Sequence, residues 1–242
     1  MLRSWLAKLL ARSQPVAPLS PGGPFCAIGD IHGRFDLLAR LLTKLEPELQ
    51  VICVGDYVDR GEHSAEVLRF LQAHPEITCL MGNHEQMLLS FLDDPKAAGP
   101  RWLRYGGLQT LASFGVAGVS DTSQGTDLEK ACEALTAAMG EDLITWLRRL
   151  PLSWQSGNIF VTHAGCDPAV PVDEQSASHL LWGHPEFFKM PLQDGNWVLH
   201  GHTIVDAPSA EAGRISIDTG AFATGRLTAA VVKGQAVKFL QA

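Results

Sequence analysis

Five short apolar runs punctuate this chain, and each stops at a glycine or a histidine where the sequence turns polar. The runs cover residues 25–29, 51–55, 77–82, 159–163 and 197–202. Short apolar runs bounded by glycine are typical of buried strands. The polar residues at or just beyond the stops are Asp30, His32, Asp56, Asp59, Asn83, His84, His163, His200 and His202. Because ligands of open α/β sheets bind beyond the carboxyl ends of the strands, we expect these side chains to meet at one edge.

The first three runs alternate with segments of helical periodicity. These segments cover residues 34–45, 64–73 and 85–92. Strand and helix therefore alternate three times along the chain. That order predicts a layered α/β fold whose first sheet is largely parallel.

The second half of the chain follows a different pattern. Residues 95–150 contain glycine-rich turns and then a predicted helix over 128–150, which indicates a mainly helical insertion. Strand-like runs resume over 159–163, 197–202, 215–218 and 227–232. Since no helical segment is evident between these last runs, we expect them to pair antiparallel.

Residues 1–24 are predicted to stand apart from the main domain, which spans 25–242. Over residues 2–12, four leucines and a tryptophan fall on one helical face. That pattern predicts a helix docked on the domain or, alternatively, an amphipathic anchor on a membrane surface. Residues 13–24 are rich in Pro, Ser and Gly, which indicates a linker.

Length, charge and cysteine content narrow the class of protein. A chain of 242 residues suits one α/β domain or two small ones. With 19 basic and 26 acidic residues the formal net charge is −7, and the absence of a Lys/Arg run disfavours nucleic-acid binding. No apolar stretch reaches the roughly 18 residues of a membrane span. Five cysteines without paired spacing indicate a reduced, cytoplasmic protein.

The residue types at the five strand ends suit a pair of divalent metal ions. Any one of them alone could be a helix cap, a turn residue or a core histidine. Together they offer carboxylate, amide and imidazole ligands, a set accepted by Mn, Fe, Zn and Ni and unlike a structural thiolate zinc site. Two metals about 3.5–4 Å apart can hold the attacking and leaving oxygens of an in-line displacement and activate water.

Three motifs carry a family resemblance. GDIHG at 29–33, GDYVDRG at 55–61 and GNHE at 82–85 resemble the signature of the calcineurin-like metallophosphoesterase superfamily. They are most similar to its phosphoprotein phosphatase family, in the bacterial and phage lambda-like branch. THAG at 162–165 and GHT at 201–203 match in order, so the resemblance covers about residues 25–234. It implies a four-layer α/β/β/α sandwich of two mixed sheets, with the metal site at the carboxyl ends of the strands.

The resemblance also implies a ligand set. The first metal would be held by Asp30, His32 and a bridging Asp56. The second metal would be held by Asp56, Asn83, His163 and one late histidine. His202 occupies the family position for that ligand, and His200 stays open as the alternative.

Further roles follow from the same resemblance. His84 matches the general acid that protonates the leaving oxygen, and Asp59 matches the carboxylate that pairs with it. Arg60 and Asn83 match phosphate-binding positions. One residue departs from the family pattern: His184 stands where a second phosphate-binding arginine is expected. Either phosphate binding is weaker and pH-dependent there, or another arginine supplies it, with these candidates: Arg34, Arg104 and Arg226.

The implied activity is metal-dependent hydrolysis of phosphate monoesters by in-line attack of a hydroxide that bridges two divalent ions, with manganese as the first expectation. The expected substrates are phosphoserine and phosphothreonine in proteins, with other small phosphoesters also accepted. A symmetrical dinucleoside tetraphosphatase is the alternative, because it shares the motifs. A non-catalytic scaffold of the same fold is disfavoured, since all ligand positions and His84 are present. For Cys166, the expectation is a packed, inert thiol, and the alternative is a redox-sensitive one.

Overall fold

The computed structural model describes residues 16–192 and 194–242. The first three apolar runs form strands joined by helices that carry the chain back to the same end of the sheet. Adjacent strands in this part therefore pair in parallel, β1 with β2 and β2 with β3. The elements are β1 (Phe25–Ile28), α2 (Phe35–Leu42), β2 (Gln50–Cys53), α3 (Ser64–Ala73) and β3 (Ile77–Cys79).

A C-terminal hairpin completes the first sheet. It consists of β9 (Thr228–Lys233) and β10 (Ala236–Gln241), and β9 lies antiparallel to β1. The strand order is β10-β9-β1-β2-β3. The run predicted over 227–232 is thus a strand of the first sheet, and its antiparallel partners are β1 and β10 rather than the other closing strands.

The second sheet has the order β4-β5-β6-β8-β7. Here the expected antiparallel pairing of the closing strands is wrong, because β5 pairs in parallel with β6, and β6 with β8. Helix α9 (Ala177–Trp182) lies in the connection between β5 and β6, and it is too short for its periodicity to stand out in the sequence. The strands are β4 (Ser153–Ser156), β5 (Ile159–Thr162), β6 (Trp197–His200), β7 (Ser209–Glu211) and β8 (Arg214–Ser216).

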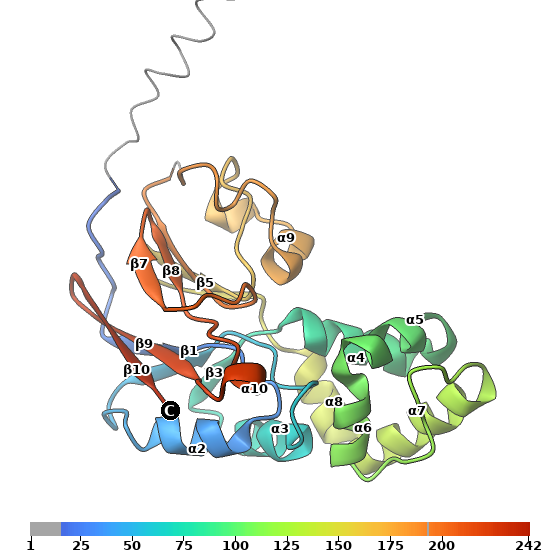
Figure 1. Ribbon diagram of the computed structural model, residues 1–242. Helices are drawn as coiled ribbons and strands as arrows, with labels where there is room; N and C mark the ends of the chain where they lie inside the picture. Colours follow the sequence, from blue (N-terminus) through green and yellow to red (C-terminus); the bar gives the residue numbers. More distant parts are fainter. Residues whose placement is uncertain (1–15, 193) are drawn as a thin grey trace, which may run out of the picture.

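The two sheets stack face to face, with helices α2 and α3 beyond the first sheet and α9 beyond the second (Figure 1). Apolar side chains from both sheets fill the layer between them: Ala27, Ile52, Val54, Leu80, Val161, Leu199 and Ile215. Burial of these facing side chains is the main favourable term that holds the sheets together. The expected α/β/β/α sandwich of two mixed sheets is confirmed.

Helices from the middle of the chain gather at one side of the sandwich (Figure 1). A kinked segment, Leu103–Gly107, joins α5 to α6, with Gly106 at φ 110°. The single helix predicted over 128–150 is two helices, because Gly140 at φ 79° ends the first of them. The helices are α4 (Asn83–Asp93), α5 (Pro95–Trp102), α6 (Leu108–Ser113), α7 (Thr126–Met139) and α8 (Glu141–Arg148). Two short elements elsewhere are the 3₁₀ turn Val172–Glu174 and α10 (Ala221–Thr224).

The helix predicted over residues 2–12 lies outside the described residues. From residue 16 on, the predicted linker has neither helix nor strand, yet it packs against the second sheet. The backbone N–H of Ser20 donates to Asn158 Oδ1 at 2.7 Å, and Trp197 Nε1 donates to the Ala17 carbonyl at 2.7 Å. Within the described part of the chain, no helix is long and apolar enough to cross a membrane.

Candidate metal centre and active site

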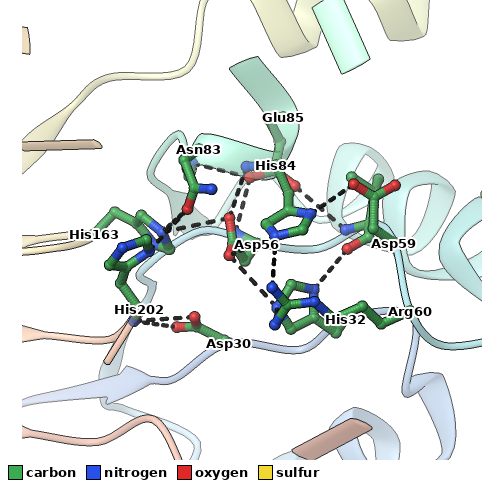
Figure 2. Close-up of polar contacts among 12 residues, drawn as sticks. Asp30, His32, Asp56, Asp59, Arg60, Asn83, His84, Glu85, His163 and His202 are labelled. Atoms are coloured by element: carbon green, nitrogen blue, oxygen red, sulfur yellow. Dashed lines mark hydrogen bonds and ion pairs between the residues drawn. The ribbon is translucent and has the colours of Figure 1, made fainter. Parts of the chain in front are cut away.

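The strand ends bring the polar residues of the motifs together, as the sheet topology requires (Figure 2). Asp30 and His32 follow β1, Asp56 follows β2, and Asn83 begins α4 just after β3. From the second sheet, His163 follows β5 and His202 follows β6. Residues from two sheets and from distant parts of the sequence therefore meet at one edge.

Asp56 lies at the middle of this cluster. Its Oδ2 is 3.5 Å from His32 Nε2, and its Oδ1 is 3.4 Å from His163 Nε2. Asp56 thereby belongs to two groups of possible ligand atoms, one with His32 and His84 and one with His163 and His202. A carboxylate with a different histidine at each oxygen is arranged to be shared between two ions.

Asn83 and Asp30 lie beside these two groups. The side-chain oxygen of Asn83 is 2.8 Å from His163 Nε2 and 2.9 Å from His202 Nδ1. The Asp30 carboxylate accepts the backbone N–H of His202 at 3.0 Å. All six expected ligands are therefore in one contiguous cluster.

Burial keeps the clustered histidines neutral. It lowers the pKa of His32 to about 3 and that of His202 to about 4, and it lowers the pKa of His163 as well. The Nδ1 atoms of His32 and His163 lie 2.8 and 3.1 Å from the carbonyl oxygens of Val58 and Val54. With Nδ1 as the donor, each Nε2 keeps its lone pair, which is the state that binds a metal.

The same cluster holds an excess of buried carboxyl groups. Burial, together with the charges of Asp218 and Asp56, raises the pKa of Asp30 well above its ordinary value. Burial also raises the pKa of Asp218 to about 6. Carboxylates this deeply buried are stable only beside compensating positive charge. Neutral imidazoles facing clustered carboxyls are a donor set that fits divalent cations.

Two glycines allow the strand ends to approach so closely. A Cβ on Gly201 would lie 2.0 Å from Asp30 Oδ1, and a Cβ on Gly55 would lie 2.6 Å from the backbone nitrogen of Gly82. The ligands themselves carry unusual backbone angles, with φ of 45° at His32, 54° at Asp56 and 61° at His202. Left-handed conformations at non-glycine residues concentrate at functional sites, where surrounding structure holds them in place.

His84 and Asp59 form a buried pair next to the cluster. His84 Nδ1 lies 2.6 Å from Asp59 Oδ2, and its other ring nitrogen, Nε2, lies 3.9 Å from Asp56 Oδ2. Burial pulls the pKa of His84 down, but the charge of Asp56 and the hydrogen bond to Asp59 outweigh it, so the net pKa is raised. With Nδ1 held by Asp59, the ring presents Nε2 to the cluster.

Arg60 directs its guanidinium to the same place. Nη1 lies 3.0 Å from His32 Nε2, and Nη2 lies 3.0 Å from His84 Nε2. The ring of Phe222, in α10, lies under the guanidinium at 4.7 Å. A planar fork of donors at this position matches the geometry of phosphate oxygens.

The structure separates the two late histidines. His202 lies in the cluster, whereas His200 Nε2 lies 3.0 Å from Ser216 Oγ and its ring packs against Phe187. His200 thus lies outside the cluster that contains His202.

His184 is not brought to the cluster by any described contact. Its Nε2 lies 3.7 Å from Asp167 Oδ2, and its ring meets that of His179. The alternative Arg34 donates to Asp36 and to the Ala221 carbonyl, and Arg104 donates to the Pro100 carbonyl. Among the described contacts, none links Arg226 to Asp56, Arg60 or His84 either. The second phosphate-binding group expected from the motif has no counterpart in these contacts.

Glu85 stands in the GNHE motif next to His84, but no role was predicted for it. It is fully buried and accepts backbone N–H groups from Asp56, Tyr57 and Gly82 at 2.8, 2.7 and 2.9 Å. It therefore ties the loop after β2 to the loop after β3. The only signal in the sequence was its place in the GNHE motif, since the partners are backbone groups. Phe222, directly after residues 218–221, was also missed, because the side chain it contacts, Arg60, lies 162 positions earlier in the sequence.

Fold and site together define the class: the chain belongs to the calcineurin-like phosphoesterases, whose family model matches residues 23–206. The family resemblance stated from the motifs is thus confirmed. The chain is a hydrolase of phosphoric esters from a family that uses dinuclear metal sites.

Individual relatives divide between two named activities. Serine/threonine-protein phosphatase 2 of Escherichia coli is 30% identical over 216 residues, which are 83% of this chain and 89% of that protein. The symmetrical bis(5'-nucleosyl)-tetraphosphatase of Nitrosococcus oceani is 35% identical over 148 residues, 59% of this chain and 44% of that protein. A solved structure provisionally named a diadenosine tetraphosphatase shares the fold, with a TM-score of 0.64, 21% identity and coverage of 93% and 98% of the two chains.

Proposed function

We propose that this enzyme hydrolyses phosphate monoesters at a dinuclear metal centre. The ligands are Asp30, His32, Asp56, Asn83, His163 and His202. The observation that carries this proposal is the position of Asp56, with His32 at one carboxylate oxygen and His163 at the other. When bound, two divalent ions would activate water and offset charge on the phosphoryl oxygens. Manganese is our first expectation, and the same ligands also accept Fe, Zn or Ni.

The chain's own side chains supply the rest of the chemistry. Arg60 and Asn83 bind the phosphoryl oxygens and orient the ester so that its leaving oxygen lies on the side of phosphorus opposite the attacking water. Water adds to phosphorus and loses a proton to solvent, the bond to the leaving oxygen breaks, and His84 donates its Nε2 proton to that oxygen and regains one from solvent. Asp59 holds the His84 ring through Nδ1, so that Nε2 faces the substrate. The products are a free hydroxyl compound and inorganic phosphate.

Phosphoserine and phosphothreonine in proteins are the substrates we propose first. This choice is supported by the E. coli serine/threonine-protein phosphatase 2, which matches over 83% of this chain. We place the enzyme in the cytoplasm, a proposal supported by five free buried cysteines.

A symmetrical dinucleoside tetraphosphate is the second candidate substrate. It is supported by the higher identity, 35%, to the N. oceani protein over 59% of the chain. A cavity of about 390 Å³ between α4, α5 and α9 offers room for the part of a substrate beyond the phosphate, and Arg101 and Trp182 are among its lining residues. Parallel assays with a phosphothreonine peptide and with diadenosine tetraphosphate discriminate between the candidates by their kcat/KM values.

The proposed function is tested by metal analysis combined with an activity assay. Protein loaded with manganese should contain two ions per chain and cleave p-nitrophenyl phosphate. Asp56→Asn should lose both properties, whereas Asp36→Asn, at an exposed carboxylate of α2 paired with Arg34, should keep both. Equal activity of native protein and Asp56→Asn would show that the shared carboxylate is not part of a catalytic metal centre.

A further inference from the structure

The carboxylate of Asp59 is held by two residues of the helical segment 95–150. The indole N–H of Trp102 points at both carboxylate oxygens, at 3.1 Å from Oδ1 and 3.0 Å from Oδ2. The hydroxyl of Thr110 donates to Oδ1 at 2.7 Å. Asp59, Trp102 and Thr110 are all completely buried. Both oxygens of the carboxylate therefore have protein donors besides His84.

The backbone around Asp59 is fixed from the same side. The N–H of Asp59 donates to Thr110 Oγ1 at 2.9 Å, so one hydroxyl holds both the backbone and the side chain of this residue. The N–H of Arg60 donates to the Gly106 carbonyl at 3.3 Å. Asp59 and Arg60 have φ of 70° and 69°, which non-glycine residues keep only when their surroundings hold them.

The kink between α5 and α6 makes these contacts possible. It lets Trp102 and Thr110, eight positions apart, reach the same carboxylate from two directions. A Cβ on Gly106 would lie 2.7 Å from the backbone nitrogen of Arg60, so the kinked segment packs directly against the backbone of Arg60 and only glycine fits there. Part of the helical segment is thus built around the residue that orients His84.

We propose that Trp102 and Thr110 are positioning residues for the reaction, which fix the plane of the Asp59 carboxylate and through it aim His84 Nε2 at the leaving oxygen. This inference rests on the proposed function, in which His84 is the proton donor. A carboxylate with one partner can rotate about its Cβ–Cγ bond and carry the imidazole with it. Donors on both oxygens remove that freedom, and misplacing a proton donor is costly because transfer requires hydrogen-bond contact.

The role of a proton donor can be separated from general damage by the choice of leaving group. Phenolate is a poor leaving group that needs a proton, whereas 2,4-dinitrophenolate departs as a stable anion. A misoriented His84 should therefore slow the hydrolysis of phenyl phosphate selectively. A merely structural defect should slow the hydrolysis of phenyl phosphate and of 2,4-dinitrophenyl phosphate by the same factor.

The experiment measures kcat for both esters with manganese-loaded enzyme. His84→Ala is the reference variant. Its kcat should fall about 10²–10⁴-fold with phenyl phosphate and far less with the dinitrophenyl ester. Trp102→Phe, which removes only the indole donor, should change the ratio of the two rates by about tenfold or more in the same direction. Thr110→Val should do the same, and Thr110→Ser, which keeps the hydroxyl, should restore the native ratio.

Trp197→Phe is the matched control. Trp197 also uses its indole N–H, which donates to the Ala17 carbonyl at 2.7 Å, but it makes no described contact with Asp59. This variant should keep the native ratio. In the metal-free protein, the ¹⁵N–¹H indole resonance of Trp102 should shift in Asp59→Asn, while that of Trp197 stays.

The outcomes separate the inference from the proposed function. If His84→Ala discriminates between the esters but folded Trp102→Phe and Thr110→Val do not, the positioning role is wrong and the proposed function stands. If His84→Ala itself keeps the native ratio, His84 is not the proton donor and the inference falls with that assignment. An unchanged Trp102 indole resonance in Asp59→Asn would also contradict the hydrogen bond on which the inference depends.

Discussion

At the scale of single residues, buried charge with a defined partner shapes this site more than any surface feature. Glu85 illustrates the point, because its two oxygens receive four backbone N–H groups, from Asp56, Tyr57, Val58 and Gly82. Burial and the charge of Asp56 raise the pKa of Glu85 to about 7, and the backbone donors of Tyr57 and Asp56 oppose that rise. The Glu85 carboxylate thus accepts buried backbone N–H groups from the loop after β2 and the loop after β3.

Replacing Glu85 by glutamine should therefore destabilise the protein. Glutamine has one acceptor oxygen, and its amide N–H₂ would face two of the donors, so backbone groups would be left unpaired in the interior. We expect a loss of about 2–5 kcal/mol in the free energy of unfolding, from about 1–3 kcal/mol for each unsatisfied group. Urea denaturation measures this loss. Glu66→Gln, at an exposed ion pair with His63, is the control and should stay within about 0.5 kcal/mol.

The protonation states of the centre also predict how metal binding depends on pH. At pH 5 the carboxyl of Asp218, whose pKa burial raises to about 6, keeps a proton that must leave when a cation binds, and burial also raises the pKa of the neighbouring Asp30. At pH 8 the proton of Asp218 is gone. His32 and His202, with pKa values of about 3 and 4, are neutral at both pH values and add no pH dependence. Metal should therefore bind more tightly at pH 8.

The corresponding measurement is the rise in melting temperature on adding manganese at each pH. The rise at pH 8 should exceed the rise at pH 5 by about 3 °C or more, since 1 kcal/mol corresponds to about 2–4 °C in a protein of this size. Comparing the two increments removes the pH dependence of the metal-free protein. A larger increment at pH 5 would contradict the protonation states assigned to the carboxyl groups.

At the scale of elements, the kink between α5 and α6 is the join between the helical segment and the active site. Gly106 and Gly115 both have positive φ, 110° and 77°, but only Gly106 has backbone atoms in the way of a Cβ. Alanine at either position meets the conformational strain of a left-handed backbone. Alanine at Gly106 must in addition displace the backbone at Arg60.

Gly106→Ala should therefore cost more stability than Gly115→Ala and should also impair catalysis. We expect about 1 kcal/mol for Gly115→Ala and at least about 2 kcal/mol for Gly106→Ala, measured by thermal unfolding. Only Gly106→Ala should raise KM for p-nitrophenyl phosphate, because it moves Arg60. Equal effects of the two variants on stability and KM would show that the close packing of Gly106 against Arg60 contributes neither to stability nor to substrate binding.

The sequence predicted those elements whose signal is local. Apolar runs ending in glycine predicted β1, β2 and β3, and the polar residues at the ends of all five apolar runs include the six expected ligands, which lie in one cluster. The parallel order of β5, β6 and β8 was missed, because it depends on a connection in which only the six residues of α9 are helical. Trp102 and Thr110 were missed because their partner is 43 and 51 positions away. A spacing of that kind leaves no periodicity to detect.

At the scale of the whole molecule, the candidate ligands come from the carboxyl ends of both sheets. Bound metal would therefore link the two sheets as well as serve the reaction. Any ligand that binds only the folded state adds to its stability by mass action, about 2.7 kcal/mol when the ligand is present at 100 times its dissociation constant.

Chelation should accordingly lower the melting temperature of the whole domain in one cooperative transition. Removing manganese with EDTA should lower it by about 5–10 °C, and adding manganese back should restore it. Calorimetry is the measurement. The Asp56→Asn variant is the control and should show little response to either treatment. A native protein that melts at the same temperature with and without metal would argue against ligands shared by both sheets.

The carboxylate of Asp30 accepts the backbone N–H of His202, a partner 172 positions further along the chain. Contacts of such long range form late, because the entropy of closing the intervening loop must be overcome first. On a ribosome, β1, β2 and β3 can emerge and begin to pair while two of the candidate ligands, His163 and His202, are still unsynthesised. We consequently expect the nascent chain to be inert toward phosphoesters until β6 has joined the second sheet, and we expect activity recovered during refolding to report the completed sandwich rather than its first half.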